Sequence, residues 1–420
     1  MTEAGEAVQG VDLKTRHITL DALRGFAVMG ILAMNIVAFA MPEMAYINPA
    51  VYGGSDGTDL VAWVLGLIFV DGKMRGLFSL LFGASMMLVI ARADAKQEGA
   101  ASVHYSRMLW LALFGLFHFF FIWWGDILFL YATIGCVAFL FHDWETKRLI
   151  KWAIGIYAIG CLFFAAAMGS MFAVQSAANA PDASEQSIKE YEEIAAELGG
   201  DPQVVQEQIA LHRGSYSEIL AQKVTENWYG PLMTPLMMIF ETLPLMMLGM
   251  AGLKGGLLLG QGPPPTYRKW AIWGIGVGGL LYAAVGYVVY SSAFDPLVTM
   301  NANMAWTMPA RLIMTIGYAA ALVMLINAFA QSGFIARVAA TGRAAFTNYL
   351  GTSIVMTAIF YGYGFGLYGK VGRAELWLFV IGAWLVMLLW SKPWLARFRY
   401  GPLEWLWRSL ARWEIQPFRR

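Results

Sequence analysis

The sequence predicts an all-α polytopic membrane protein, a bundle of about ten transmembrane helices. Of the 420 residues, 59% are hydrophobic and only 14% are charged, whereas about a quarter of the residues of a soluble domain are charged. The charged residues also cluster between apolar stretches that are long enough to cross a bilayer as helices. The formal net charge of +1 points to no acidic partner. We therefore expect membrane lipids and a small-molecule substrate as partners, and no nucleic acid.

The predicted spans are 22–41, 59–91, 107–123, 127–141, 149–175, 231–252, 270–291, 308–331, 344–365 and 374–390. The second is irregular because three charged residues between Asp71 and Arg75 interrupt it. We expect it to cross once, as a helix broken near Asp71–Arg75. Irregular charged backbone within a membrane is tolerated only where it lines a cavity. Whether residues 59–70 cross, re-enter or lie on the surface is left open.

Basic residues predict the orientation. If 59–91 crosses once, the loops on one side hold the basic clusters, from Lys14 and Arg16 through Lys254 to the tail that begins at Lys392. Cytoplasmic loops carry an excess of Lys and Arg, so we expect both termini in the cytoplasm. The polar N-terminal lead is interpreted as part of a retained anchor, because no small-residue cleavage site follows the first span.

Four parts are expected: an N-terminal membrane half (1–178), an extracytoplasmic helical insertion (179–230), a C-terminal membrane half (231–391) and a cytoplasmic tail (392–420). The insertion holds ten acidic and three basic residues. Within it, Asp182 and Glu185 have the spacing of a helix-starting capping box. We interpret the insertion as a solvated cap, or alternatively as a lid or partner surface.

The tail 392–420 is expected to contain an amphipathic helix that lies on the inner leaflet. Leu403, Leu406 and Leu410 recur at helical spacing, and Arg408 and Arg412 flank them. Such a helix binds anionic lipid surfaces through its basic side chains.

Several sequence blocks resemble a known family. The first is R-x-I-x-L-D-x-L-R-G from Arg16, and the others are Asp71–Gly83, Gly115–Ala132, Thr341–Gly351 and Gly401–Arg408. Together they resemble the YeiB-like bacterial inner-membrane proteins, the domain of unknown function 418 family. The first block is also remotely similar to the heparan-glucosaminide acetyltransferase group of transmembrane acyltransferases. The resemblance implies a bacterial inner-membrane location and acyl transfer with acyl-coenzyme A as donor.

The candidate catalytic residues are His118 and Asp126. A neutral imidazole can act as a general base near neutral pH, and a carboxylate can orient it and stabilise its charged form. In the acetyltransferase group the histidine proposed to act lies between the first two helices, where residues 42–58 of this chain contain none. His118 would therefore be its replacement. The alternative is a structural histidine bonded to a backbone carbonyl.

The charged residues Asp71, Lys73 and Arg75 are candidate substrate-binding residues. Three charges within one crossing are costly unless they pair or face water. Lys73 or Arg75 can bind an anionic group or stabilise developing negative charge. The alternative is an Asp71–Arg75 ion pair that holds the helix break.

Other polar residues within spans are further candidates. Asn35 and Asn348 are expected to line a substrate site or to bond helices together. Glu241 lies near the middle of its span. We interpret it as a substrate ligand, a proton carrier or a protonated glutamate that is hydrogen-bonded across helices. Arg311 is interpreted as an interfacial anchor.

The donor site is expected at the cytoplasmic face. Asp21 and Arg24 are three residues apart on one helix and can pair. We expect both, together with Arg343, to bind the donor, with the arginines at its phosphates. No tightly bound cofactor and no metal site are expected, because Cys136 and Cys161 both lie inside apolar spans.

The leading hypothesis from the sequence is a transmembrane acyltransferase that uses a cytoplasmic thioester donor. The alternatives are a transporter for a small solute that depends on Glu241, and a non-catalytic scaffold whose acidic insertion binds a partner. The sequence leaves the oligomeric state open, a homo-oligomer included.

Overall fold

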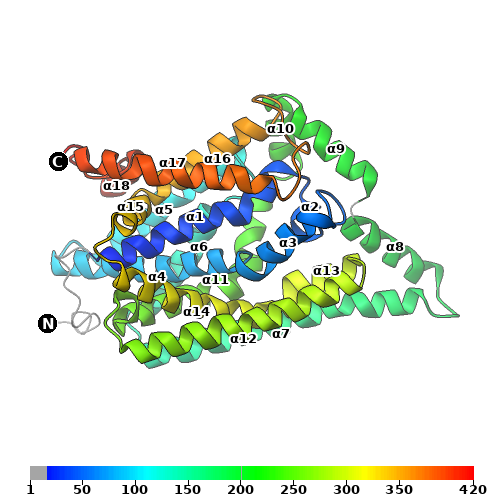
Figure 1. Ribbon diagram of the computed structural model, residues 1–420, viewed down its shortest axis with the longest axis horizontal. Helices are drawn as coiled ribbons and strands as arrows, with labels where there is room; N and C mark the ends of the chain where they lie inside the picture. Colours follow the sequence, from blue (N-terminus) through cyan, green and yellow to red (C-terminus); the bar gives the residue numbers. More distant parts are fainter. Residues whose placement is uncertain (1–16, 200) are drawn as a thin grey trace.

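The computed structural model describes residues 17–199 and 201–420. The described chain is a helical bundle (Figure 1), which confirms the predicted fold class. Within these residues, seven segments are long and apolar enough to cross a membrane: α1 Ile18–Ala40, α3–α4 Gly57–Ala95, α7 Thr146–Ala178, α11 Gly230–Lys254, α12 Pro264–Ser291, α14 Met308–Ala328 and α17 Leu376–Arg397. Two shorter apolar segments are Leu128–Phe141 (α6 Leu128–Ala138 and η2 Phe139–Phe141) and α16 Ala345–Phe360. With α5 Ala100–Phe121, these helices occupy the ten predicted spans.

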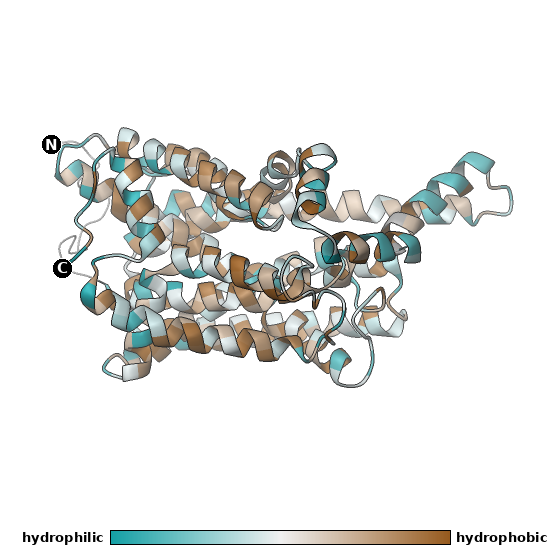
Figure 2. Cartoon of the chain, turned by 90° about the horizontal axis from the view of Figure 1, so that it is seen from above, coloured by the Kyte–Doolittle hydropathy of each residue, from teal (hydrophilic) through white to brown (hydrophobic). Residues whose placement is uncertain are grey.

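The remaining helices are short or lie outside the spans. They are α2 Met44–Ile47, α8 Glu185–Gly199, α9 Pro202–Arg213, α10 Tyr216–Thr225, η3 Leu257–Leu259, α13 Pro296–Asn301, the π-helix η4 Ala302–Trp306, α15 Gly333–Arg343 and α18 Pro402–Arg412. An isolated antiparallel bridge joins Phe398 to Arg419. Figure 2 shows hydrophilic residues on the α7–α8 projection and apolar residues along the bundle.

The bundle has two distinct ends (Figure 1). The first turn of α1 and helix α18 lie at one end, which we call the basic end. Helices α2, α9 and α10 lie at the other, which we call the cap end. The predicted basic residues Lys14 and Arg16 lie outside the described residues.

The predicted break in the second span is present between α3, which ends at Phe69, and α4, which begins at Lys73. Gly72 adopts a φ of +72°, a left-handed conformation that favours glycine. Helix α4 then packs closely on α11, because a Cβ added at Gly83 or Gly249 would overlap a backbone carbonyl of the other helix.

The insertion folds as helices α8, α9 and α10, and two of them cover the cap end. Arg213 of α9 donates to the Tyr368 carbonyl at 2.7 Å, and Tyr216 of α10 donates to the Phe121 carbonyl at 2.8 Å. The predicted capping box at Asp182 is wrong. Helix α8 begins at Glu185, and the hydroxyl of Ser184 accepts from the Ser187 amide, because a residue directly before a helix is better placed to cap it.

Candidate functional site

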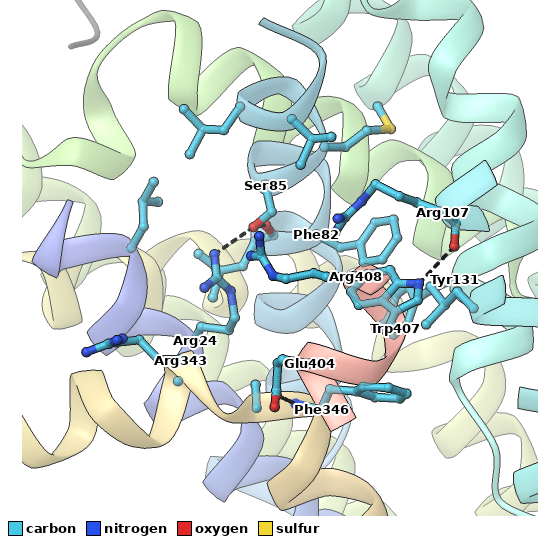
Figure 3. Close-up of a pocket in the computed structure, with 18 of the residues that line it drawn as sticks. Arg24, Phe82, Ser85, Arg107, Tyr131, Arg343, Phe346, Glu404, Trp407 and Arg408 are labelled. Carbon is cyan, nitrogen blue, oxygen red and sulfur yellow. Dashed lines mark hydrogen bonds between the residues drawn. The ribbon is translucent and has the colours of Figure 1, made fainter. Parts of the chain in front are cut away.

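A cavity of about 520 Å³ opens at the basic end of the bundle. Its wall includes two of the predicted donor-binding residues, Asp21 and Arg24 of α1, and the third, Arg343 at the end of α15. We call it the basic cavity because six arginines line it: Arg24, Arg92, Arg107, Arg343, Arg399 and Arg408. Figure 3 labels four of these, which come from α1, α5, α15 and α18. Among the described residues of the same wall the carboxylates are Asp21 and Glu404, so positive charge predominates there.

Arg24 is held in place by two neighbours. Its Nη1 lies 3.1 Å from Asp21 Oδ1, which is the pairing that the three-residue spacing predicts. Its Nη2 donates to the Ser85 hydroxyl of α4 at 2.9 Å (Figure 3). These contacts fix the direction of the guanidinium, because two partners on different helices define its plane.

Helix α18 forms one wall of the basic cavity through a buried glutamate. Glu404 accepts hydrogen bonds from the Phe346 amide at 2.7 Å and from the Thr347 amide and hydroxyl at 3.1 and 2.6 Å. Burial raises the pKa of Glu404, while these donors oppose the shift. The predicted amphipathic helix is therefore docked on α16 by a polar contact, and Arg408 of the same helix is brought into the cavity.

The inner part of the basic cavity is apolar and aromatic. Phe78 and Phe82 of α4 line it, together with Ile127, Tyr131 and Tyr349. Tyr131 is itself fixed, because its ring stacks on Phe82 at 5.3 Å. The cavity thus changes from cationic at its mouth to apolar at its inner end, which suits a ligand that is charged at one end only.

His118 and Asp126 lie together directly behind this inner end. His118 Nδ1 is 2.8 Å from Asp126 Oδ1, and both side chains are buried. Asp126 also accepts from the Phe129 amide at 2.7 Å, which fixes the carboxylate at the start of α6. The Tyr349 ring, which lines the basic cavity, has its centroid 5.2 Å from that of His118. The pairing is the one that general-base chemistry needs, and the catalytic role stays a prediction.

His118 Nε2 has no hydrogen-bond partner among the described residues, although it is fully buried. Because Nδ1 faces a carboxylate, we assign the proton to Nδ1, which leaves the lone pair on Nε2. A buried acceptor without a partner is costly, so this nitrogen is a candidate contact for a ligand atom.

A second buried cluster of charges lies next to the inner end of the basic cavity, where Tyr131 donates to the Arg75 carbonyl at 3.2 Å. Arg75 Nη2 is 3.1 Å from Glu241 Oε1, and Arg311 Nη1 is 2.6 Å from Glu241 Oε2. The alternative interpretation, in which Arg75 pairs with Asp71, is therefore wrong. Asp71 instead accepts a hydrogen bond from the Tyr46 hydroxyl at 2.5 Å. Arg311 is buried and paired, so its interpretation as an interfacial anchor is wrong.

The remaining predicted residues are buried at separate positions. Lys73 donates to the Leu67 carbonyl at 2.5 Å and stands 3.3 Å from the centre of the Tyr282 ring. Asn348 bonds the Thr341 carbonyl at 3.0 Å and accepts from the Trp390 indole. Asn35 is buried in α1 and, of the described residues, is not one that lines the basic cavity. Their substrate roles stay predictions.

Four arginines of the basic cavity were missed as site residues, namely Arg92, Arg107, Arg399 and Arg408. Each lies in a basic cluster that the sequence assigns to loop charge or to the lipid surface. All four are predicted to lie at the same face of the membrane, but only the fold brings them together around one cavity. Within residues 17–199 and 201–420, no group of three or more His, Cys, Asp or Glu side chains is arranged to hold a metal ion.

The chain is similar to several proteins. The family described as a protein of unknown function (DUF418) matches residues 253–414. Uncharacterized protein YxaH of Bacillus subtilis (strain 168) is 32% identical over 420 residues, which cover 95% of this chain and 94% of the relative. Uncharacterized protein YeiB of Escherichia coli (strain K12) is 30% identical over 411 residues, which cover 94% and 96%. No solved structure matches. With this similarity over nearly its whole length, the chain belongs to the DUF418 family of YeiB-like membrane proteins.

Proposed function

We propose that the protein is a transmembrane acyltransferase that moves an acyl group from a cytoplasmic thioester donor, acyl-coenzyme A, to a small or envelope acceptor. One observation carries this proposal. The basic cavity joins six arginines at its mouth to an apolar inner end that lies against Tyr349, the neighbour of His118. An acyl-coenzyme A likewise has phosphates at one end and its thioester at the other. The remote resemblance of the first helix to transmembrane acyltransferases adds support.

The arginines are suited to the phosphate end of such a donor. Guanidinium groups bind phosphates with two parallel hydrogen bonds, which gives both energy and direction. The volume of about 520 Å³ is within the range of about 300–1,000 Å³ for small-molecule sites. Arg24 and Arg343, predicted from the sequence, then act together with Arg92, Arg107, Arg399 and Arg408.

The transfer step uses His118 as base. Nε2 takes the proton from a hydroxyl or amine of the acceptor while that oxygen or nitrogen attacks the thioester carbonyl carbon. The carbon–sulfur bond then breaks, and the sulfur leaves as the thiol with the proton from the imidazolium. Asp126 holds the Nδ1 proton and stabilises the charged ring. Tyr349 separates His118 from the cavity, so its side chain has to move aside for the thioester to pass.

In this proposal the basic end faces the cytoplasm of a bacterial inner membrane, with both termini on that side. The excess of arginines at this end is the pattern of cytoplasmic loops. The acceptor then approaches from the cap end, where α10 covers the loop next to His118. Lys223 of α10 donates to the Ile122 carbonyl at 3.3 Å.

Binding of coenzyme A to the purified protein tests the donor site. We expect Arg24→Gln and Arg408→Gln each to weaken binding by about tenfold, because a hydrogen bond to a charged group contributes about 1.5–3 kcal/mol. Arg148→Gln is the matched control, since Arg148 stacks on Trp144 outside the cavity. Equal affinity in all four proteins would reject the donor site.

Transport remains the alternative because a buried ion cluster surrounds Glu241. Ionisable residues inside a membrane often mark solute or proton pathways. This alternative predicts solute uptake into vesicles that is lost in Glu241→Gln and unaffected in His118→Ala. Acyl transfer predicts the opposite pattern, provided that both variants fold.

A further inference from the structure

A second cavity, of about 600 Å³, lies between α16 and α17 on the outside of the bundle. We call it the α16–α17 groove. Its walls are side chains of these two helices, and it runs from Thr347 and Trp390 near the basic end to Ile359 and Leu378 toward the cap end. It is distinct from the basic cavity, with which it shares no lining residue.

The groove opens toward hydrocarbon. Val355 is 51% exposed, Leu378 71% and Val386 62%, although all three are apolar. Both helices are apolar segments of a membrane protein, so the medium in front of these side chains is lipid. An apolar groove in that position has the size and polarity to hold a hydrocarbon chain.

The length of the groove corresponds to one leaflet. Thr347 and Ile359 are twelve residues apart on α16, which is about 18 Å at the rise of an α-helix. Half of the hydrocarbon core of a bilayer is about 15 Å. The groove is therefore long enough for one acyl chain of one leaflet, with the polar end of the lipid near Thr347.

Glycines keep the groove open from both sides. Gly351 of α16 and Gly382 of α17 line it, and a Cβ added at either would meet nothing within 4 Å. A larger side chain at either position would occupy the space in front of it. Both positions therefore offer a way to fill the groove without disturbing the packing behind it.

A positive charge lies beyond the polar end of the groove. Arg397 follows Trp390 by seven residues, two helical turns, and so lies on the groove face of α17. Its side chain is exposed. A cation at this level attracts the phosphate of an anionic lipid.

We propose that the α16–α17 groove binds one acyl chain of an anionic phospholipid, with its headgroup at Arg397. This proposal is independent of acyl transfer. It places a lipid directly behind the wall of the basic cavity, because Thr347 lines the groove and bonds Glu404, which lines the cavity.

Photolabelling in vesicles tests the proposal. The probe is phosphatidylglycerol with a diazirine at the end of one acyl chain, in phosphatidylethanolamine vesicles that contain the full-length protein. We expect labels on residues 355–359 and 378–382. Gly351→Leu and Gly382→Leu should each reduce this labelling by about tenfold, which corresponds to about 1.4 kcal/mol. Gly276→Leu is the control, since Gly276 of α12 also faces open space but lies outside the groove.

The headgroup has its own test. Arg397→Gln should reduce labelling by the phosphatidylglycerol probe to the level of a matched phosphatidylethanolamine probe. Equal labelling by both probes in the wild type would overturn the choice of an anionic lipid. Labels spread evenly over α7, α12 and α17, and unchanged in both leucine variants, would overturn the site. A groove that is unlabelled in a dimeric protein would show that a second copy covers it.

Discussion

Arg311 Nη1 donates to Glu241 Oε2 over 2.6 Å, and both side chains are buried. Arg75 donates to the same carboxylate from α4, so one glutamate ties together α4, α11 and α14. Arg311 also donates to the Asn303 carbonyl at 2.9 Å, within the π-helix that precedes α14. Glu241 therefore stabilises the packing of these three helices, and with it any site that is built around this residue.

Glu241→Gln should destabilise the protein by about 3–5 kcal/mol, because it leaves two buried arginines without a compensating charge. Thermal unfolding in detergent measures this effect. The double variant Glu241→Gln/Arg311→Met should recover part of the loss, since one of the unpaired charges is removed. A double variant that is less stable than Glu241→Gln would contradict the assigned pairing.

Some members of this cluster, but not their pairing, could be predicted from the sequence. Glu241, Arg75 and the break at Asp71 were singled out because charges inside apolar spans are costly. Their partners could not be assigned, because Arg75 and Glu241 are 166 residues apart, and helical spacing relates only neighbours on one helix. Arg311 was assigned to the interface for the same reason, since its partner is on another helix.

Gly83→Ala should loosen the contact between α4 and α11. The added methyl group would overlap the Met246 carbonyl, and backbone cannot move aside as a flexible side chain can. We expect a loss of about 1–3 kcal/mol, the usual cost of overpacking, in detergent unfolding experiments. Gly276→Ala, with open space around the new methyl group, should leave the unfolding temperature unchanged. Equal effects of the two substitutions would contradict the close packing.

Glu404→Ala should release α18 from α16, because Phe346 and Thr347 lose their common acceptor. We expect faster hydrogen exchange in residues 402–412 and weaker binding of coenzyme A, since Arg408 is no longer held in the cavity. Glu414→Ala, at an exposed position of the same tail, should change neither. Slow exchange that persists in Glu404→Ala would show that other contacts dock the helix.

The contact between α9 and the cap end should weaken in acid. Burial lowers the pKa of His212 to about 4, while His212 stacks on Tyr368 and lies near Tyr361. Lys223 is the nearby cation that contributes to the lowered pKa. The pKa of a histidine in the unfolded chain is about 6.5. Neutral His212 therefore stabilises the folded state fully above pH 6.5, and this stabilisation is lost as the pH falls through 6.5 toward 4.

Hydrogen exchange of residues 202–213 at pH 7 and pH 4.5 measures this loss. His212→Phe keeps an aromatic ring against Tyr368 and removes the titration, so its exchange protection should differ less between the two pH values. The same pH dependence in wild type and His212→Phe would show that another group is responsible.

The spans and the pairing at His118 could be predicted, whereas the cavity could not. Ten apolar segments and the broken helix follow from local composition and hydropathy. His118 and Asp126 are eight residues apart and meet because the chain turns between α5 and α6. The basic cavity, in contrast, draws its arginines from residues 24 to 408, and no local pattern distinguishes an arginine in a cavity from one at the lipid surface.

The most direct measurement is thiol release from acetyl-coenzyme A by the purified protein, supplied with a mixture of small hydroxyl and amine acceptors. Wild type should release thiol, and His118→Ala should lower the rate by about 100-fold or more, the usual contribution of a general base, in protein that unfolds only above the assay temperature. His142→Ala, which changes a histidine outside the basic cavity, should retain the wild-type rate. A folded His118→Ala protein that releases thiol at the wild-type rate would contradict the proposed mechanism.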